Sequence, residues 1–232
     1  MSAHNAEQAL APMLGALVRE HETADVLAEL VHDCATLLPA DAAALLVTNG
    51  RGSLELLSAT SHRASELEVY QAQHRSGPCV DALRHGDRVM AVGADDIVTR
   101  WPEVGTVIVE SGFQAVHALP MVWHGRVLGG LNVFSVEAVP LEGASLQLAQ
   151  HFADVASIAL AQPGMLEDDE LDERISSALE GRVVIEQAKG VLAHTLGVDM
   201  ATAYDELLRR TLDTGSTLSA TARDVVREAH QR

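Results

Sequence analysis

An α+β protein is predicted for this chain, with a mixed domain of helices and strands first and a purely helical segment after it. Within the first 160 residues or so, short apolar runs flank Asn49-Gly50 and His124-Gly125, which indicates antiparallel hairpins. After about residue 165, apolar residues recur at three- and four-residue spacing, which is typical of amphipathic helices. A length of 232 residues suits one large domain and a small module.

The composition limits the classes of function. Hydrophobic residues make up 47% of the chain, enough for a core, and no run approaches the about 18 to 20 uncharged apolar residues of a membrane span. Residues 1–17 have no basic stretch before their apolar part, so we expect no signal peptide and a cytoplasmic protein without a membrane partner. Two cysteines and eleven scattered histidines predict neither a disulfide framework nor a metal site.

The net charge of −17 bears directly on nucleic-acid binding. A negative overall field repels phosphates. Binding of RNA or DNA therefore requires a local basic surface. We count a net charge of −1 from Glu180 onward, so the acidic excess lies elsewhere and the C-terminal helices have room for such a surface.

The first half of the mixed domain begins with helical periodicity over residues 6–38, which Glu22 and Thr23 interrupt. A hairpin is predicted from strands 42–48 and 54–60. A helix over 63–74, one or two helical turns around Val80 and Leu83, and a strand over 89–92 follow.

The second half of this domain is expected to close the sheet. Asp95, Asp96 and Pro102 predict a loop, and 104–112 predicts a helix ending in glycine. Strands 114–123 and 126–136 form a second hairpin, and an amphipathic helix covers 146–161. With a helix at each end of the domain covering one face, the sheet is antiparallel.

This order of elements, with Gln73, Gly77, Pro78 and Cys79, resembles the GAF sensor domains over about residues 8–162. The resemblance implies a sensor with an unidentified small molecule as its ligand. Cys79 follows a Gly-Pro turn at a helix start, where a thiol pKa can be depressed, or it is a small packed residue. Cys34 is expected in the core. His117 is expected to be structural, with a haem or metal role as the alternative.

Residues 163–180 form a predicted acidic helical linker. The charge run 167–173 is expected to be a solvated first turn or linker. Leu171, Ile175, Ala178 and Leu179 keep helical spacing, which would suit a short coiled-coil seam.

Residues 181–232 are predicted to form a three-helix bundle. Gly197 ends the first helix, residues 200–211 form the second, and Ser216 or Thr217 caps the third. A bundle of this size is hardly stable alone, so we expect it to pack on the preceding helix or on a second chain.

The run Arg-Val-Val-Ile-Glu-Gln-Ala-Lys-Gly from Arg182 to Gly190 identifies the bundle with a family. With Ala203-Tyr204, Leu207, and the apolar positions Leu218, Ala222 and Val225-Val226, it resembles the ANTAR domain. That resemblance implies a homodimer that binds paired RNA hairpins in nascent transcripts and prevents termination, acting on the transcription machinery indirectly.

The candidate RNA-binding residues follow from this resemblance and from their charge. Lys189, the only lysine in the chain, lies two helical turns after Arg182, and Tyr204 is either a core aromatic or a stacking platform for an unpaired base. The complete candidate set is Arg182, Lys189, Tyr204, Arg209, Arg210, Arg223 and Arg227. Solvated helix residues, or for Arg182 an ion pair with Glu186, are the alternatives.

The chain departs from the family at two places. Gly215-Ser216-Thr217 stands where the family usually has a polar, basic connector, and Leu208 stands where arginine is common. These departures and the acidic charge favour an alternative function, a ligand-binding GAF sensor whose C-terminal helices mediate dimerisation or protein contacts without RNA. No catalytic arrangement of residues stands out, so an enzyme is not expected.

Overall fold

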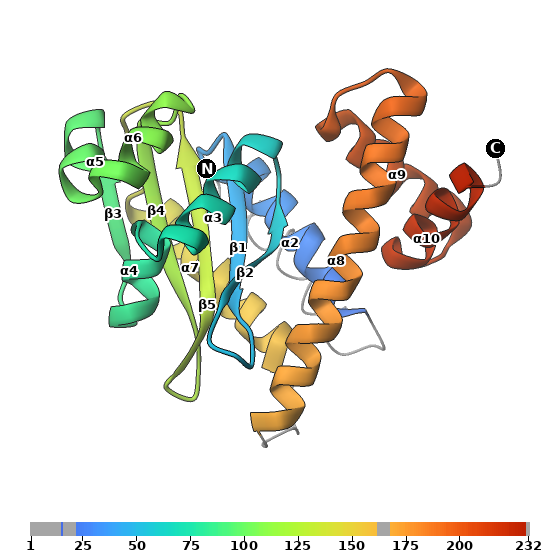
Figure 1. Ribbon diagram of the computed structural model, residues 1–232, viewed down its shortest axis with the longest axis horizontal. Helices are drawn as coiled ribbons and strands as arrows, with labels where there is room; N and C mark the ends of the chain where they lie inside the picture. Colours follow the sequence, from blue (N-terminus) through green and yellow to red (C-terminus); the bar gives the residue numbers. More distant parts are fainter. Residues whose placement is uncertain (1–14, 16–21, 162–167, 231–232) are drawn as a thin grey trace.

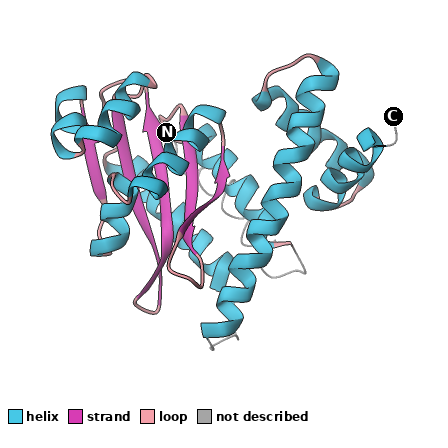
Figure 2. Ribbon diagram, in the orientation of Figure 1, coloured by secondary structure: helices cyan, strands magenta, loops and turns pink. Residues whose placement is uncertain are grey.

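The computed structural model describes Gly15 and residues 22–161 and 168–230, and it confirms the α+β class (Figures 1 and 2). The predicted helical periodicity before Glu22, apart from Gly15, and residues 163–167 of the predicted acidic linker lie outside the described residues. Within them, no helix is long and apolar enough to cross a membrane.

The sheet has five strands in the order β2-β1-β5-β4-β3, and every neighbouring pair is antiparallel. The hairpin turns predicted at Asn49-Gly50 and His124-Gly125 join β1 to β2 and β4 to β5. The strands are β1 (Ala42–Thr48), β2 (Leu54–Ala59), β3 (Val89–Val92), β4 (Ala115–Trp123) and β5 (Arg126–Ser135).

Helices cover both faces of this sheet, and the helices at the two ends of the domain cover one and the same face, as expected (Figure 1). The helices described for the sensor are α2 (Thr23–Leu37), α3 (His62–His74), α4 (Pro78–His85), α5 (Ala94–Arg100), α6 (Pro102–Glu110) and α7 (Gly143–Ala161). On one face, α2 and α7 pack against alternate strand residues such as Leu45 and Leu131. On the other face, α3, α5 and α6 pack around Phe113 and Phe134. The central strands β1, β4 and β5 are buried on both sides, which explains their nearly continuous apolar runs.

The loop predicted around Asp95 and Asp96 is wrong, because these residues begin α5. Asp96 accepts hydrogen bonds from the backbone N–H of Val92 (3.2 Å) and from Arg100 Nε (3.0 Å). Carboxylates favour the first turn of a helix, where backbone N–H groups are unpaired. Pro102 begins α6 as its first residue, a position that proline tolerates well.

A single helix, α8 (Asp168–Leu196), joins the acidic segment to the C-terminal module (Figure 1). Residue 181, where we expected the bundle to begin, lies inside this helix. Ile175 and Ala178, two residues of the expected coiled-coil seam, are buried in the sensor's hydrophobic cluster, and Leu179 packs against it. The side chain of Leu171 lies outside the described part. The described seam residues therefore pack within the chain.

The remaining helices, α9 (Met200–Thr214) and α10 (Leu218–His230), pack on the second half of α8. Asp199 caps α9 by accepting from Thr202 N at 2.8 Å, and Thr217 caps α10 by accepting from Ala220 N at 3.2 Å. The capping role expected for Thr217 is confirmed. The three-helix bundle at the C-terminus is thus formed as its caps and periodicity indicate.

Candidate nucleic-acid interface

Lys189 lies on the side of α8 that faces the sensor, and it is only 7% exposed. Its Nζ donates to Glu186 Oε1 at 2.8 Å, an ion pair one turn apart on the helix. The same Nζ lies 5.6 Å from the centre of the Tyr204 ring, within the range of a cation–π contact. In this conformation Lys189 is neither open to RNA nor solvated, because its charged group is covered.

Tyr204 extends from α9 toward the sensor helix α2. Its ring lies 5.4 Å from the ring of His32, and the residue is 9% exposed. Among the described residues its hydroxyl has no hydrogen-bond partner. Burial, followed by the nearby Glu29 carboxylate, raises the pKa of the Tyr204 phenol well above its ordinary value. The hydroxyl is therefore a neutral, unused donor.

Arg182 of α8 is half-buried and lies three residues, slightly less than one turn, before the buried Ile185. Its Nε has no hydrogen-bond partner in the part of the chain that the structure describes. Burial lowers the pKa of its guanidinium, while Glu186 and Glu55 of β2 partly oppose that change. The alternative for Arg182, an ion pair with Glu186, is not formed, because Glu186 pairs with Lys189.

The four candidate arginines of α9 and α10 lie away from this contact. Arg209 and Arg210 both bind Glu206, at 2.7 and 2.8 Å, and Arg209 also pairs with Asp213. These hydrogen bonds lower the pKa of Glu206 to about 2. These arginines lie at the surface, where solvent screens ion pairs and other anions can compete for the cation.

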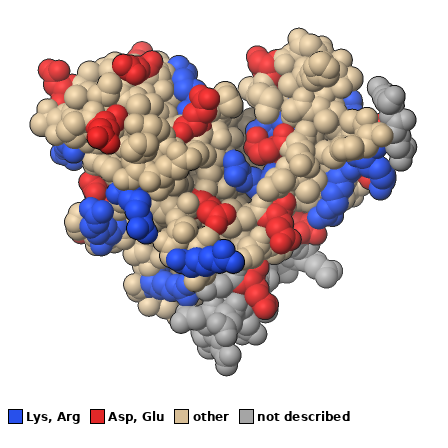
Figure 3. Space-filling view, in the orientation of Figure 1, with Lys and Arg blue, Asp and Glu red and all other residues tan. Residues whose placement is uncertain are grey.

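Arg223 and Arg227 are exposed on one side of α10, four residues apart. Arg227 pairs with Asp224, and Arg223 makes no ion pair with any described residue. Figure 3 shows Lys and Arg side chains gathered along the edge of the bundle at α10. The candidate set is thus divided between an inner side (Arg182, Lys189 and Tyr204) and an outer side (Arg209, Arg210, Arg223 and Arg227).

The sensor interior holds a buried polar network that sequence reasoning missed. Glu68 of α3 is fully buried and accepts hydrogen bonds from Asn132 Nδ2 (2.6 Å) and Gln71 Nε2 (3.0 Å). Gln71 in turn accepts from the backbone N–H of Cys79 at 3.2 Å. Burial raises the pKa of Glu68 to about 8. The sequence contained one signal for this network, because Glu68 occupies a position of the helical pattern that belongs to the core.

This network decides between the two readings of Cys79 in favour of the small packed residue. Burial, then the neighbouring Glu68, raises the pKa of the Cys79 thiol, so the helix start does not activate it. Cys34 is fully buried in the core as expected. His117 accepts from Leu141 N at 2.9 Å, and burial lowers its pKa to about 4, so it is a neutral structural residue.

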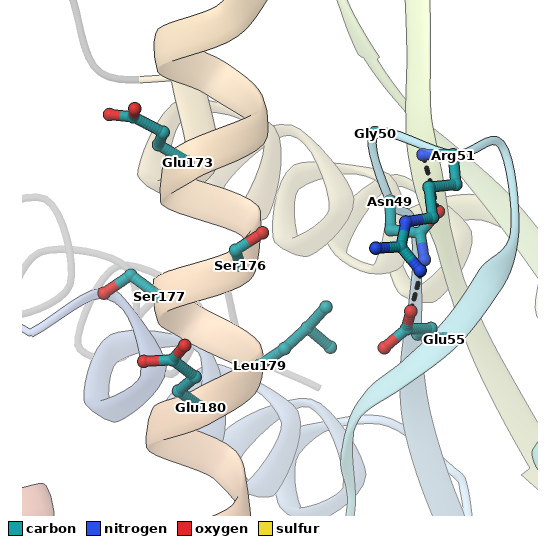
Figure 4. Close-up of a pocket in the computed structure, with 9 residues that line it drawn as sticks. All are labelled: Asn49, Gly50, Arg51, Glu55, Glu173, Ser176, Ser177, Leu179 and Glu180. Atoms are coloured by element: carbon teal, nitrogen blue, oxygen red, sulfur yellow. Dashed lines mark hydrogen bonds between the residues drawn. The ribbon is translucent and has the colours of Figure 1, made fainter.

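A pocket of about 710 Å³ separates the turn between β1 and β2 from the first half of α8 (Figure 4). Asn49 donates to Glu55 across the hairpin, and Arg51 also lines this space. From α8, the side chains of Ser176 and Leu179 point toward the hairpin, whereas those of Glu173, Ser177 and Glu180, which also line the pocket, point away from it. In the described ranges, no group of three or more His, Cys, Asp or Glu residues could hold a metal ion.

Comparisons with known proteins agree with this division of the chain. Three solved structures are similar in fold to the first domain of this chain. A GAF domain of a phosphoenolpyruvate-protein phosphotransferase from Coxiella burnetii is 16% identical, with a TM-score of 0.54 over 69% of this chain and 95% of that chain. Its counterpart from Acinetobacter is 13% identical, with a TM-score of 0.52 over 68% and 93%. The phycoerythrobilin-bound GAF domain of a cyanobacterial phytochrome is 15% identical, with a TM-score of 0.54 over 69% and 97%.

At these identities the similarity shows the fold alone. No curated protein matched the chain. Among family models, the GAF domain matches residues 22–160 and the ANTAR domain matches residues 173–226. Because the first match spans more than half of the chain and the second follows it directly, this protein belongs to the GAF family and joins its GAF domain to a C-terminal ANTAR domain.

Proposed function

We propose that this protein is a signal-responsive RNA-binding regulator that binds paired hairpins in nascent transcripts and prevents termination. The ANTAR match over residues 173–226, on a module that presents arginines in solvent, carries the proposal. A signal received by the GAF domain changes the presentation of the bundle through α8, the helix that the two domains share.

The distribution of charge supports RNA as the partner. By our count the chain from Glu180 onward has a net charge of −1, while the whole chain has −17. Arg209, Arg210 and Arg227 pair with carboxylates that are partly or largely open to solvent and that a phosphate can replace, and Arg223 has no ion pair among the described residues. Local cations can therefore bind a phosphate backbone although the protein as a whole is acidic.

Two further features belong to the proposal. An RNA with two hairpins suits two bundles, so the working form is a homodimer in the cytoplasm, where it meets the transcription machinery through the transcript. We assign the chain a regulatory and not an enzymatic role, because it joins a GAF domain to an ANTAR domain.

Fluorescence anisotropy with a labelled tandem-hairpin RNA tests the proposal, and a single hairpin of the same composition is the control. We expect tighter binding to the tandem RNA, with affinity falling as salt rises with a log–log slope of about −0.7 to −0.9 per phosphate contact. Sedimentation in parallel gives the oligomeric state. A stable dimer without RNA affinity at low salt would instead support a sensor whose C-terminal helices only dimerise or bind a protein.

A further inference from the structure

Helix α2 has two buried faces that belong to different cores. Leu27, Leu30 and Cys34 pack into the sensor beneath the sheet. Ala24 and Ala28 belong instead to the hydrophobic cluster of the C-terminal bundle, with Ile185, Ala188, Leu192, Ala203, Tyr204, Leu207, Leu218, Ala222 and Val225. The bundle thus uses a sensor helix as part of its own core.

The crossing of α2 and α8 depends on the absence of a side chain. A Cβ atom at Gly181 would lie 2.5 Å from Ala24 Cβ, closer than such atoms normally approach. Glycine is unfavourable inside a helix by about 1 kcal/mol relative to alanine. Its position here is explained by the close approach of the two helices.

A polar contact ties the other end of the bundle to the same helix. Asp25 of α2 accepts hydrogen bonds from the backbone N–H of Ser219 (2.9 Å) and from the Ser219 hydroxyl, at the start of α10. A carboxylate at a helix N-terminus pairs with unsatisfied N–H groups and with the positive end of the helix dipole. The sensor therefore caps a helix of the bundle.

These contacts close the space over the inner side. Lys189 and Tyr204 line a pocket of about 100 Å³, and the opposite wall is formed by Ala28 and His32 of α2 and by Thr60. That volume holds about three water molecules. The pocket is too small for a phosphate backbone, and it is also too small for a stacked base that remains attached to its RNA.

The charges on α2 also oppose RNA at this contact. Asp25, Glu29 and Asp33 are spaced four residues apart, so they lie along one side of the helix. All three act electrostatically on the Tyr204 phenol, which places them beside the inner side. A phosphate approaching Lys189 meets three carboxylates as well as a steric barrier.

We infer that α2 and RNA compete for the inner side of the bundle, so that the conformation described here is the autoinhibited state of the regulator. This inference rests on the proposed function. RNA binding through Lys189 and Tyr204 requires the bundle to separate from Ala24, Asp25, Ala28 and His32, while the outer arginines stay accessible throughout. The apparent dissociation constant then equals the intrinsic one divided by the separated fraction.

Because Lys189 is the only lysine in the chain, the reactivity of its amine measures the separation of the bundle from α2 in the absence of RNA. We would label amines under trace conditions and quantify the peptide containing Lys189 by mass spectrometry, apart from the N-terminal amine. Gly181→Ala introduces the clash with Ala24, and Gly190→Ala is the matched control because a Cβ there meets nothing within 4 Å. We expect Gly181→Ala to accelerate labelling about tenfold and to tighten tandem-hairpin binding by a similar factor, and Gly190→Ala to do neither.

A reversible crosslink provides the opposite test in the full chain. Asp25→Cys with Ser219→Cys places two thiols where the wild-type side chains are in contact, and both native cysteines are buried. The oxidised form, identified by its mass, should lose RNA binding that reduction restores. Equal RNA affinity of the oxidised and reduced forms, or slow Lys189 labelling together with tight RNA binding, overturns the inference and leaves the proposed function standing. Fast labelling of Gly181→Ala with no RNA binding overturns the proposed function, and the inference falls with it.

Discussion

The inner and outer sides of the C-terminal bundle both carry cationic side chains, but those of the inner side are covered and those of the outer side are exposed. On the inner side, Lys189 is 7% exposed and is held by Glu186 and the Tyr204 ring. On the outer side, Arg223 is exposed and has no ion pair within the described residues. The difference teaches that a cation's availability depends on what packs over its helix. Under the proposed function, the outer side would therefore make the first contact with an RNA.

The largest expected effect comes from removing the core that holds both sides in place. Leu207 is fully buried in the bundle, whereas Leu212 on the same helix is 82% exposed. Leu207→Ala should lower the free energy of unfolding by about 2 to 5 kcal/mol, because it deletes buried methyl groups and leaves a cavity. Leu212→Ala should change it by about 0.5 kcal/mol or less. Urea denaturation followed by circular dichroism measures both, and equal losses would show that Leu207 does not anchor the bundle.

A second prediction tests the sensor that covers the inner side. The pKa of Glu68, ordinarily near 4.5, is raised to about 8 by burial. Between these pH values the folded protein holds a proton that the unfolded chain releases. Stability should therefore fall as pH rises from about 4.5 to 8, by a few kcal/mol, and then level off.

Glu68→Gln should remove that slope, because the amide does not titrate and Asn132 Oδ1 has no partner among the described residues, so it can accept from it. Glu66→Gln, an exposed change on the same helix, is the control and should keep the slope. Denaturation midpoints measured across this pH range give the result. An unchanged slope in Glu68→Gln would assign the titration to another group.

The third prediction concerns the removal of two arginines from the outer side alone. Arg223→Ala with Arg227→Ala should weaken tandem-hairpin binding about tenfold at low salt and reduce the log–log salt slope by about 1 to 2, because two phosphate contacts are lost. Arg88→Ala removes an exposed arginine of the sensor and should change neither. Loss of affinity without a change in salt slope would mean that these arginines do not contact phosphates.

The elements of this fold were readable in the sequence because their signals are local. Asn49-Gly50 marks the hairpin between β1 and β2, and Thr217 caps α10 as expected. The error at Asp95 and Asp96 is also local. Two aspartates before a proline suit a loop and a capped helix start equally well, and only the contacts of Asp96 with Val92 and Arg100 decide between them.

The candidate site was less readable because its decisive contacts are distant in sequence. Helical spacing placed Arg182 and Lys189 on one face of α8 but could not identify what covers that face. The covering helix is joined to the bundle by Asp25 and Ser219, which are 194 positions apart. Glycine at position 181 was visible, but its meaning depends on Ala24 across the crossing.

The fourth prediction tests Lys189 on the inner side. In the Gly181→Ala background, where the inner side is uncovered, Lys189→Ala should weaken RNA binding about fivefold, because one cationic contact is lost. Gln187→Ala, on the exposed face of the same helix, should leave affinity unchanged. The thermal midpoint should stay near that of the background, since Glu186 keeps partial access to water. Anisotropy and thermal denaturation measure the two quantities, and an unaltered affinity would remove Lys189 from the RNA-binding surface.

The smallest effect is expected at the Tyr204 hydroxyl. It is buried and has no hydrogen-bond partner among the described residues, so Tyr204→Phe breaks no bond and removes a polar atom that burial disfavours. Stability should stay the same or rise by about 1 kcal/mol or less. If Tyr204 stacks on a base after the bundle separates, RNA affinity should also persist, because stacking uses the ring. Tyr204→Leu in the Gly181→Ala background removes the ring and should weaken binding. Lower stability in Tyr204→Phe would reveal a partner for the hydroxyl, and affinity lost in both variants would assign RNA recognition to the hydroxyl and not to stacking.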